Sequence, residues 1–278
     1  MGFLDLFSKQ KALFFPECTT FYKNKEGFKA YQEIFKKLGI NYFLLDEHLC
    51  SGIEILQAGY EQEARKQARK VFDLFQEKGV DAIITTDPKS YKVFTQDYKE
   101  FLPDWNIKVV NIWELILERL RKKHQLIKNR PVETITFHDS CHLGRYCKIY
   151  EEPRQILQAI GYQIEEMDNA KEDAFCSGGC GNLPFTNPPL ANKIARERVL
   201  QAKRIGVKKM VVTSFDSYNL LRKNAKNTGV EIVELSYVLA HALDIPIGLE
   251  ESVDEEENVL LEEKIKPILT QNEEEGNE

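Results

Sequence analysis

An internal duplication is the feature that most constrains the fold of this chain. Two halves of the sequence align at an offset of roughly 125 residues, and four matching stretches occur in the same order in both halves. The matches pair residues 12–18 with 134–141, 49–52 with 175–178, 82–91 with 210–218, and 109–115 with 232–238. One match would mean little, but four in a constant order predict two modules with the same fold.

Within each half, short apolar runs alternate with longer amphipathic segments. The apolar runs of the first half are typical of buried strands and cover residues 12–15, 42–45, 82–84 and 109–110. Apolar residues at helical spacing, each time followed by a glycine, predict helices over residues 27–38, 61–78, 153–160 and 189–205. This alternation predicts an α/β fold of two pseudo-repeated, Rossmann-like modules, each a parallel sheet with helices on both faces.

We therefore divide the chain into five segments. They are an N-terminal amphipathic segment (1–11), a first module (12–121), a basic linker (122–131), a second module (132–249) and an acidic tail (250–278). The tail holds 12 acidic and 2 basic residues, which leaves 36 basic and 32 acidic residues in the body. A nearly balanced body gives no footprint for nucleic acid, and we expect the tail to be a disordered, solvated extension. The alternative for its weakly amphipathic part, residues 259–269, is a docking peptide.

Hydrophobicity and cysteine usage indicate a cytoplasmic protein. No apolar stretch approaches the roughly 18 residues that a membrane-spanning helix needs. The N-terminus lacks the basic region and cleavage site of a signal peptide. In the cytoplasm the six cysteines would be kept reduced or would bind metal.

Polar or thiol side chains directly follow predicted strands in both halves. They are Cys18, Asp87, Cys141 and Ser214. Because the carboxyl ends of parallel strands meet at one edge of a sheet, where ligands collect, we expect these side chains to gather there.

The second half carries most of the cysteines. Cys141 lies in the run His-Asp-Ser-Cys-His at 138–142, Cys147 follows six positions later, and the run Cys176-Ser-Gly-Gly-Cys180 comes further on. Thiolates in this setting suit an iron–sulfur cluster or zinc. The glycines let the backbone approach such a group and supply N–H donors to its sulfurs.

On these motifs the chain resembles the cysteine-rich CCG family. This family includes the B-type and D-type subunits of heterodisulfide reductase and the iron–sulfur subunits of lactate and glycerol-3-phosphate oxidases. The resemblance covers residues 13–243 and is most specific in Phe137-His-Asp-Ser-Cys-His-Leu-Gly-Arg-Tyr146. In intact modules a Cys after the first strand, a Cys-Cys-Gly and a later Cys-x-x-Cys hold a non-cubane [4Fe–4S] assembly.

This chain departs from that pattern in both modules. The first keeps Cys18 and has Cys50-Ser-Gly52 for Cys-Cys-Gly, but Asp87-Pro-Lys-Ser90 stands for Cys-x-x-Cys. The second keeps Cys141 and has Cys176-Ser-Gly178, with Ser214-Phe-Asp-Ser217 in the last place. Each module thus retains two of five family thiols, so a non-cubane assembly is not expected, because serine is a poor substitute for thiolate.

Cys147 and Cys180 are thiols gained in the second module. Together with Cys141 and Cys176 they give the four thiolates that an ordinary [4Fe–4S] cubane requires. The alternatives are zinc, with four thiolates or with His138 or His142 among its ligands, a disulfide pair, or inert buried thiols.

Cys18 and Cys50 rank lower as metal ligands, because no third ligand is visible in the first module. We expect them to be inert, or to form a redox-active pair if the fold brings them together, as the family pattern implies.

Other polar residues favour supporting roles. His138 and His142 are expected to form hydrogen bonds, and Arg145 to form a surface salt bridge or to anchor an anionic substrate. Asp87 and Asp216 fall where the family has Cys-x-x-Cys, so they are interpreted as replacements and not as an acid–base pair. We identify no catalytic residue.

Two functional hypotheses follow. The first is an iron–sulfur electron-transfer or disulfide-reductase-like subunit of a heterodisulfide reductase-related complex, with at most one conventional cluster, in the second module. Its partners would be other redox subunits, iron–sulfur or flavin proteins, and any association with a membrane would go through a partner. The alternative is a metal-free structural or regulatory subunit that keeps the fold for docking. The cysteines gained at positions 147 and 180 favour the iron–sulfur subunit, whereas the lost family cysteines favour the metal-free subunit.

Overall fold

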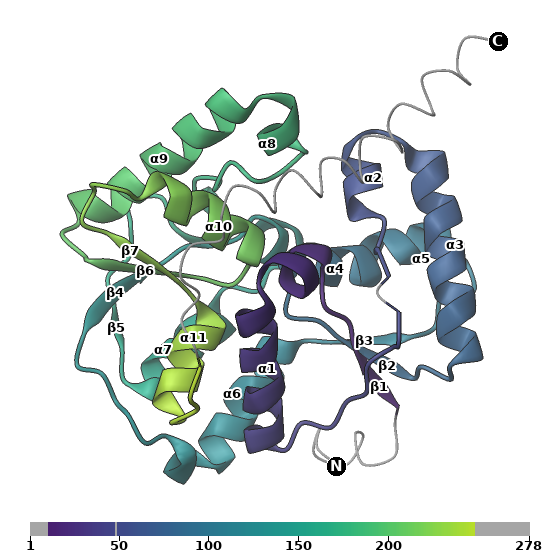
Figure 1. The fold of residues 1–278 in the computed structure, drawn as a ribbon, viewed down its shortest axis with the longest axis horizontal. Coiled ribbons are helices and arrows are strands. Elements are labelled where there is room, and N and C mark those ends of the chain that lie inside the picture. The colour runs from purple at the N-terminus through teal and green to yellow at the C-terminus, as the bar shows by residue number, and fades with distance from the viewer. Residues whose placement is uncertain (1–10, 48, 248–278) are drawn as a thin grey trace. The chain divides into compact units, whose positions relative to one another are not determined.

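The computed structural model describes residues 11–47 and 49–247 and contains two parallel sheets (Figure 1). The first sheet has the order β1-β2-β3, formed by β1 (Ala12–Phe14), β2 (Ala82–Ile84) and β3 (Lys108–Val110). The second has the order β5-β4-β6-β7, formed by β4 (Thr134–Phe137), β5 (Gln163–Ile164), β6 (Lys209–Val212) and β7 (Glu231–Glu234). The predicted fold class is confirmed.

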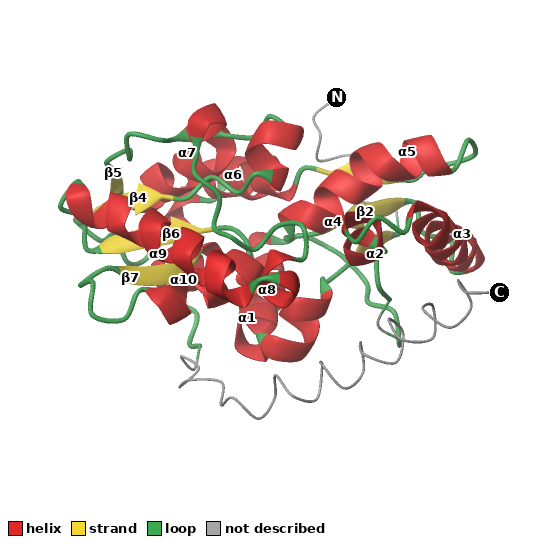
Figure 2. Ribbon diagram, turned by 90° about the horizontal axis from the view of Figure 1, so that it is seen from above, coloured by secondary structure: helices red, strands yellow, loops and turns green. Residues whose placement is uncertain are grey.

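Helices surround both sheets (Figure 2). In the first half they are α1 (Lys25–Leu38), α2 (Ile53–Gln57), α3 (Glu61–Glu77), α4 (Pro88–Lys92), α5 (Tyr98–Phe101) and α6 (Ile112–Lys122). In the second half they are α7 (Glu151–Ile160), α8 (Leu183–Thr186), α9 (Pro188–Arg204), α10 (Phe215–Asn224) and α11 (Leu235–Ala242). Short π-helical turns cover Thr19–Lys23, Val93–Asp97 and His142–Tyr146, and 3-10 turns cover His124–Leu126 and Lys171–Asp173. The four long helices predicted from periodicity are confirmed as α1, α3, α7 and α9.

The strand expected over residues 42–45 is not formed. Phe43 makes one parallel bridge to Leu13, through hydrogen bonds from Phe14 N to Phe43 O and from Phe43 N to Ala12 O, both 2.9 Å long. The chain then leaves the sheet, and Leu44 is partly exposed. An apolar run alone does not separate a strand from an extended loop that touches the sheet once. The bridge lies beside β1 as β5 lies beside β4, which agrees with the duplicated architecture.

One hydrophobic core extends across both sheets. Helix α1 packs on α11, and α6 packs on α7, so elements from the two halves of the chain face each other (Figure 1). The largest core cluster includes Phe14 and Trp113 from the first half, with Phe137 and Val211 from the second. A smaller cluster between α3 and the first sheet contains residues of the first half alone.

No helix within residues 11–47 and 49–247 is long and apolar enough to cross a membrane. The predicted amphipathic N-terminus, apart from Lys11, and the predicted acidic tail lie outside the described residues.

A buried carboxyl group joins the two halves next to the core. Glu234, at the end of β7, accepts a hydrogen bond of 2.7 Å from Tyr31 Oη of α1. It also accepts one of 2.6 Å from Ser236 N. Burial raises the pKa of Glu234 to about 7, so the folded protein holds a proton there that the unfolded chain releases at lower pH.

We predict from this that stability falls as the pH rises. The contribution of protonated Glu234 is complete below about pH 4.5 and is lost as the pH passes 7, a change on the order of 3 kcal/mol. Urea unfolding of Glu234→Gln at pH 5 and pH 8 should show a smaller difference than the unsubstituted protein. The exposed Glu231→Gln on the same strand is the control. If the free energy of unfolding fell as much between pH 5 and pH 8 in Glu234→Gln as in the unsubstituted protein, the prediction would be contradicted.

Candidate metal centre

Three thiols of the second half meet at one point. Cys141 follows β4, whereas Cys176 and Cys180 belong to the turn that precedes α8. Cys141 Sγ lies 2.9 Å from Cys180 Sγ, and Cys176 Sγ lies 3.7 Å from Cys180 Sγ. The fold therefore assembles three of the four predicted ligands of the second module.

Glycine shapes the turn that carries Cys176 and Cys180. Gly178 has φ +89°, and a Cβ atom there would lie 2.6 Å from the carbonyl oxygen of Ala191 in α9. Only glycine tolerates both conditions. Gly178 N donates to Cys176 Sγ at 3.3 Å, which places a backbone N–H on a thiolate, as the glycine-rich sequence predicts.

The three sulfurs share their protons unequally. Hydrogen bonds with Cys141 and Cys180 hold the pKa of Cys176 well below its usual range, and the N–H of Gly178 acts in the same direction. A hydrogen bond with Cys176 raises the pKa of Cys141 to about 11, and a hydrogen bond with Cys141 raises that of Cys180. These contacts favour thiolate character at Cys176.

His142 lies beside the sulfurs, with Nδ1 at 3.4 Å from Cys141 Sγ and 4.0 Å from Cys180 Sγ. Its Nε2 lies 2.9 Å from Nε2 of Gln57, which is the last residue of α2 in the first half. Gly181 N donates to Gln57 Oε1 at 3.2 Å, so the amide must present its NH2 group to the imidazole. Burial lowers the pKa of His142 to about 4, which keeps the ring neutral. Its proton is therefore on Nδ1, facing the sulfurs.

We expect substitution of Gln57 to change the tautomer of His142. In Gln57→Glu the carboxylate can only accept, so the imidazole proton should move to Nε2 and leave Nδ1 as an open donor to metal. In Gln57→Leu, neither tautomer is held. Nitrogen chemical shifts of ¹⁵N-histidine in the metal-free variants would distinguish these states. Identical shifts in all three proteins would contradict the relay.

A second buried histidine is oriented in the same way. Arg198 of α9, which is fully buried, donates from Nε to His138 Nδ1 at 3.1 Å. Burial lowers the pKa of His138 to about 3. The neutral ring therefore carries its proton on Nε2. The expected hydrogen-bonding role of His138 is present, but Gln57 and Arg198 were not predicted, because neither lies near a cysteine in the sequence.

The residues that replace the family's Cys-x-x-Cys meet between the halves. Lys89, after β2, forms an ion pair with Asp216, after β6. Asp216 Oδ1 also accepts from Thr19 Oγ1 at 2.5 Å. Ser217 Oγ donates to Ser177 Oγ at 3.1 Å, so two serines at thiol positions bond to each other. Ser217 and Ser177 stand at positions where the family has metal-binding cysteines, whereas Lys89 and Asp216 stand at x positions of the two Cys-x-x-Cys segments.

Asp87 is buried beside this ion pair. Its Oδ2 accepts from Ser90 N at 2.7 Å and caps α4. Burial, together with the charge of Asp216, raises the pKa of Asp87 to about 7. Of the four residues expected to gather at the sheet edge, Cys141 and Ser214 line one pocket, together with Lys89 and Asp216, whereas Cys18 and Asp87 are not in its lining.

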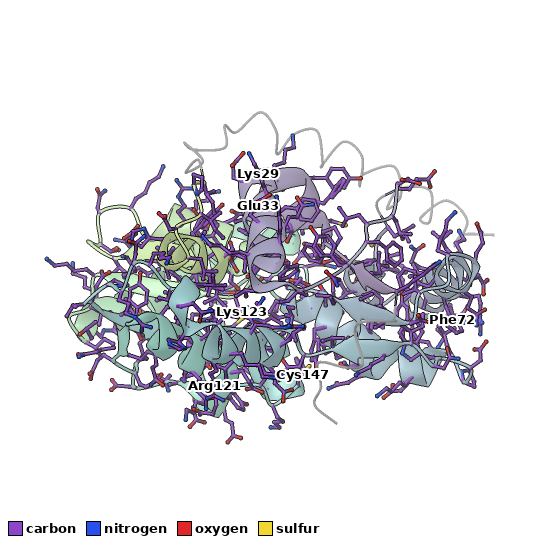
Figure 3. The ribbon with its side chains drawn as sticks, turned by 90° about the horizontal axis from the view of Figure 1, so that it is seen from below. Lys29, Glu33, Phe72, Arg121, Lys123 and Cys147 are labelled. Carbon is purple, nitrogen blue, oxygen red and sulfur yellow. The ribbon has the colours of Figure 1, made fainter. Side chains whose placement is uncertain are left out.

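Cys147, which Figure 3 labels, has Gln96 as a neighbour. Its sulfur lies 3.9 Å from Gln96 Nε2 and packs against the core, and burial raises its pKa to about 11. None of the sulfur–sulfur contacts found within residues 11–47 and 49–247 includes it. Arg145 donates to the carbonyl oxygen of Ala174 at 2.6 Å and so holds the segment before Cys176. In the first half, the thiols of Cys18 and Cys50 form a hydrogen bond with each other.

The assembled donors fit a thiolate-bound metal. Three soft sulfurs suit iron–sulfur groups or zinc. Around one tetrahedral ion with metal–sulfur bonds of about 2.3 Å, sulfurs stand about 3.8 Å apart. The distance from Cys176 to Cys180 matches this value, whereas the 2.9 Å from Cys141 to Cys180 is shorter. In a cubane each thiolate binds its own iron, so the sulfurs would separate further. Potential ligand atoms of Cys141, His142 and Cys180 all lie within 4.8 Å of one another.

A model of the CCG cysteine-rich domain matches the sequence twice, over residues 12–91 and 135–233. The chain belongs to the CCG family. The two matches fall on the two sheets, one in each half.

Proteins similar to this CCG chain include larger redox proteins. A probable iron–sulfur-binding oxidoreductase, FadF, from Bacillus subtilis is 33% identical over 69% of this chain and 27% of its own length. The D-type subunit of a dihydromethanophenazine:CoB–CoM heterodisulfide reductase from Methanosarcina acetivorans is 28% identical over 86% of this chain and 60% of its own length. The chain therefore spans less than two thirds of these relatives.

Among solved structures, a hypothetical protein from Helicobacter pylori is similar, with a TM-score of 0.54 and 12% identity. The match covers 87% of this chain and 50% of that protein. At this identity the likeness shows the fold alone.

Proposed function

We propose that this CCG chain is an iron–sulfur redox subunit, related to the disulfide-reductase branch of the family, with a single metal centre in its second half. The observation that carries the proposal is the meeting of Cys141, Cys176 and Cys180 at 2.9 to 3.7 Å from separate segments. The printed names of the relatives, an iron–sulfur-binding oxidoreductase and a heterodisulfide reductase subunit, agree with it.

The chain's own residues would hold the group and adjust its environment. Cys141, Cys176 and Cys180 supply three thiolates, and the N–H groups of Gly178 and His142 point at their sulfurs. Such donors stabilise negative charge on sulfur and raise the reduction potential. The chemistry that an iron–sulfur group supplies when bound is the uptake and release of single electrons. Partners would be further redox proteins, iron–sulfur or flavin, which supply and accept those electrons.

Metal analysis tests this function. Protein purified without oxygen is assayed for iron, acid-labile sulfide and zinc, and an electron paramagnetic resonance spectrum is recorded after reduction. Iron and sulfide in equal amounts, with a signal on reduction, are the expected result. One zinc per chain without sulfide would contradict the redox centre and would indicate a structural zinc site instead.

A metal-free docking subunit is the second candidate. The observation that favours it is the presence of serines at family thiol positions, of which Ser217 and Ser177 form a hydrogen bond with each other. Protein without iron or zinc after anaerobic purification would support this candidate and exclude the first.

A further inference from the structure

The first half contains a second pair of thiols that the proposed metal centre does not use. Cys18 begins the π-helical turn after β1, and Cys50 lies 32 residues later, before Gly52 and α2. The fold brings them together, and their thiols form a hydrogen bond with each other. Gly52 N also donates to Cys50 Sγ, at 3.4 Å. Both cysteines are partly exposed.

We propose that Cys18 and Cys50 form a dithiol that reduces a disulfide substrate by thiol–disulfide exchange. Cys50 is the attacking thiol and Cys18 the resolving one. The inference rests on the proposed function only for the return of electrons to the pair from the redox centre and its partners.

The exchange is balanced in atoms and electrons. The Cys50 thiolate attacks one sulfur of the substrate, the substrate S–S bond breaks, and the first substrate thiol leaves after taking up a proton. The Cys18 thiolate then attacks Cys50 Sγ and releases the second substrate thiol, which leaves a Cys18–Cys50 disulfide. The protein gives up two electrons and two protons, and the substrate disulfide takes up both.

The surroundings assign the two roles. Cys50 Sγ has the hydrogen bond of Cys18 and the N–H of Gly52, which stabilise a thiolate, and its pKa is lowered mainly by the bond with Cys18. The same hydrogen bond raises the pKa of Cys18, with burial and the charge of Glu17 acting in the same direction. A thiolate is the nucleophile in exchange, and the N–H of Gly52 stabilises a thiolate at Cys50, so Cys50 is assigned the first attack.

The charge near the pair limits the substrate. The acidic side chains of Glu17, Glu54 and Asp87 act on this region, and Lys89 is the cation among them, already paired with Asp216. A disulfide without negative charge is therefore favoured over an anionic one.

A short helix connects the pair to the thiols of the second half. Helix α2 begins three residues after Cys50 and ends at Gln57, which contacts His142 and Gly181. Five helical residues extend only about 7 Å. Asn182 Nδ2 also donates to Glu54 O at 3.0 Å, so α2 is bonded to the Cys176–Cys180 turn. Helix α2 thus links the segment that holds Cys50 to the residues beside the group that would return its electrons.

The test uses the full chain, reduced and purified without oxygen, with cystamine as a cationic disulfide and glutathione disulfide as an anionic one. Differential alkylation and peptide mass spectrometry should show a peptide linked through Cys18 and Cys50 in the unsubstituted protein. Cys18→Ser should trap a cysteamine mixed disulfide on Cys50, whereas Cys50→Ser should give neither product. Cystamine should react several-fold faster than glutathione disulfide, and added salt should narrow the difference.

Matched variants separate this inference from the proposed function. Cys147→Ser, which removes a thiol outside both groups, should form the linked peptide like the unsubstituted protein. Cys176→Ser should lose the metal but still form the peptide linked through Cys18 and Cys50. Cys18→Ser should keep the metal. Absence of the linked peptide while Cys147 becomes modified would overturn the dithiol. Loss of metal in both Cys18→Ser and Cys50→Ser would also overturn the proposed dithiol, because Cys18 and Cys50 would then be metal ligands.

Discussion

Replacement of Cys176 by serine is expected to remove most of the bound iron, whereas replacement of Cys147 by serine should leave the iron content nearly unchanged. Cys176 Sγ lies 3.7 Å from Cys180 Sγ in the sulfur cluster and accepts a hydrogen bond from Gly178 N. Its serine oxygen would be a hard and weakly acidic ligand for iron. Cys147 lies against Gln96 and the core, outside that cluster.

The measurement is iron and labile sulfide per chain in both variants, purified side by side without oxygen. Circular dichroism of each variant controls for folding. Equal iron loss in Cys147→Ser and Cys176→Ser would show that Cys147 moves to the cluster and becomes its fourth thiolate, as the count of cysteines in the sequence suggests. Retention of iron in Cys176→Ser would contradict the ligand set proposed from the structure.

Substitution of Arg154 by methionine should destabilise the protein by about 3 to 5 kcal/mol. Its guanidinium forms two bonds to Asp139, of 2.7 and 2.8 Å, and two to Glu166, of 2.6 and 2.9 Å. The Arg154 and Asp139 side chains are 4% and 2% exposed. Without the arginine, Asp139 would remain as a buried charge two residues before Cys141.

Urea unfolding measures this effect. Arg204→Met is the matched control, because Arg204 pairs with Glu197 on the surface of α9 and such pairs contribute less than about 1 kcal/mol. A double variant, Arg154→Met with Asp139→Leu, should recover part of the loss, since it removes both buried charges. A loss in Arg154→Met no larger than in the control would show that water solvates Asp139 without cost.

The sequence predicted the fold well because the duplication supplies each element twice. A weak periodicity in one half is supported by the matching segment of the other half, as for the helix predicted over residues 153–160, which is α7 in the structure. The strand expected over residues 42–45 was wrong, since one bridge at Phe43 depends on how far the chain follows β1, which hydrophobicity does not encode.

The candidate site was only partly predictable. Strand ends and glycine turns brought Cys141, Cys176 and Cys180 to one edge, which the parallel-sheet rule anticipates. The direction of Cys147 could not be predicted, because a π-helical turn over His142–Tyr146 separates it from Cys141 and sets its orientation. Gln57 and Arg198 bond to histidines 85 and 60 residues away, and such long-range contacts leave no local pattern in the sequence.

The core that crosses between the two sheets has a consequence for the history of the chain. Trp113 and Phe14 are buried in the same cluster as Phe137 and Val211, so neither repeat can melt without exposing the apolar face of the other. Heat should therefore unfold residues 11–247 in a single transition. Neither repeat can therefore be lost during evolution without exposing the apolar surface against which the other repeat folds.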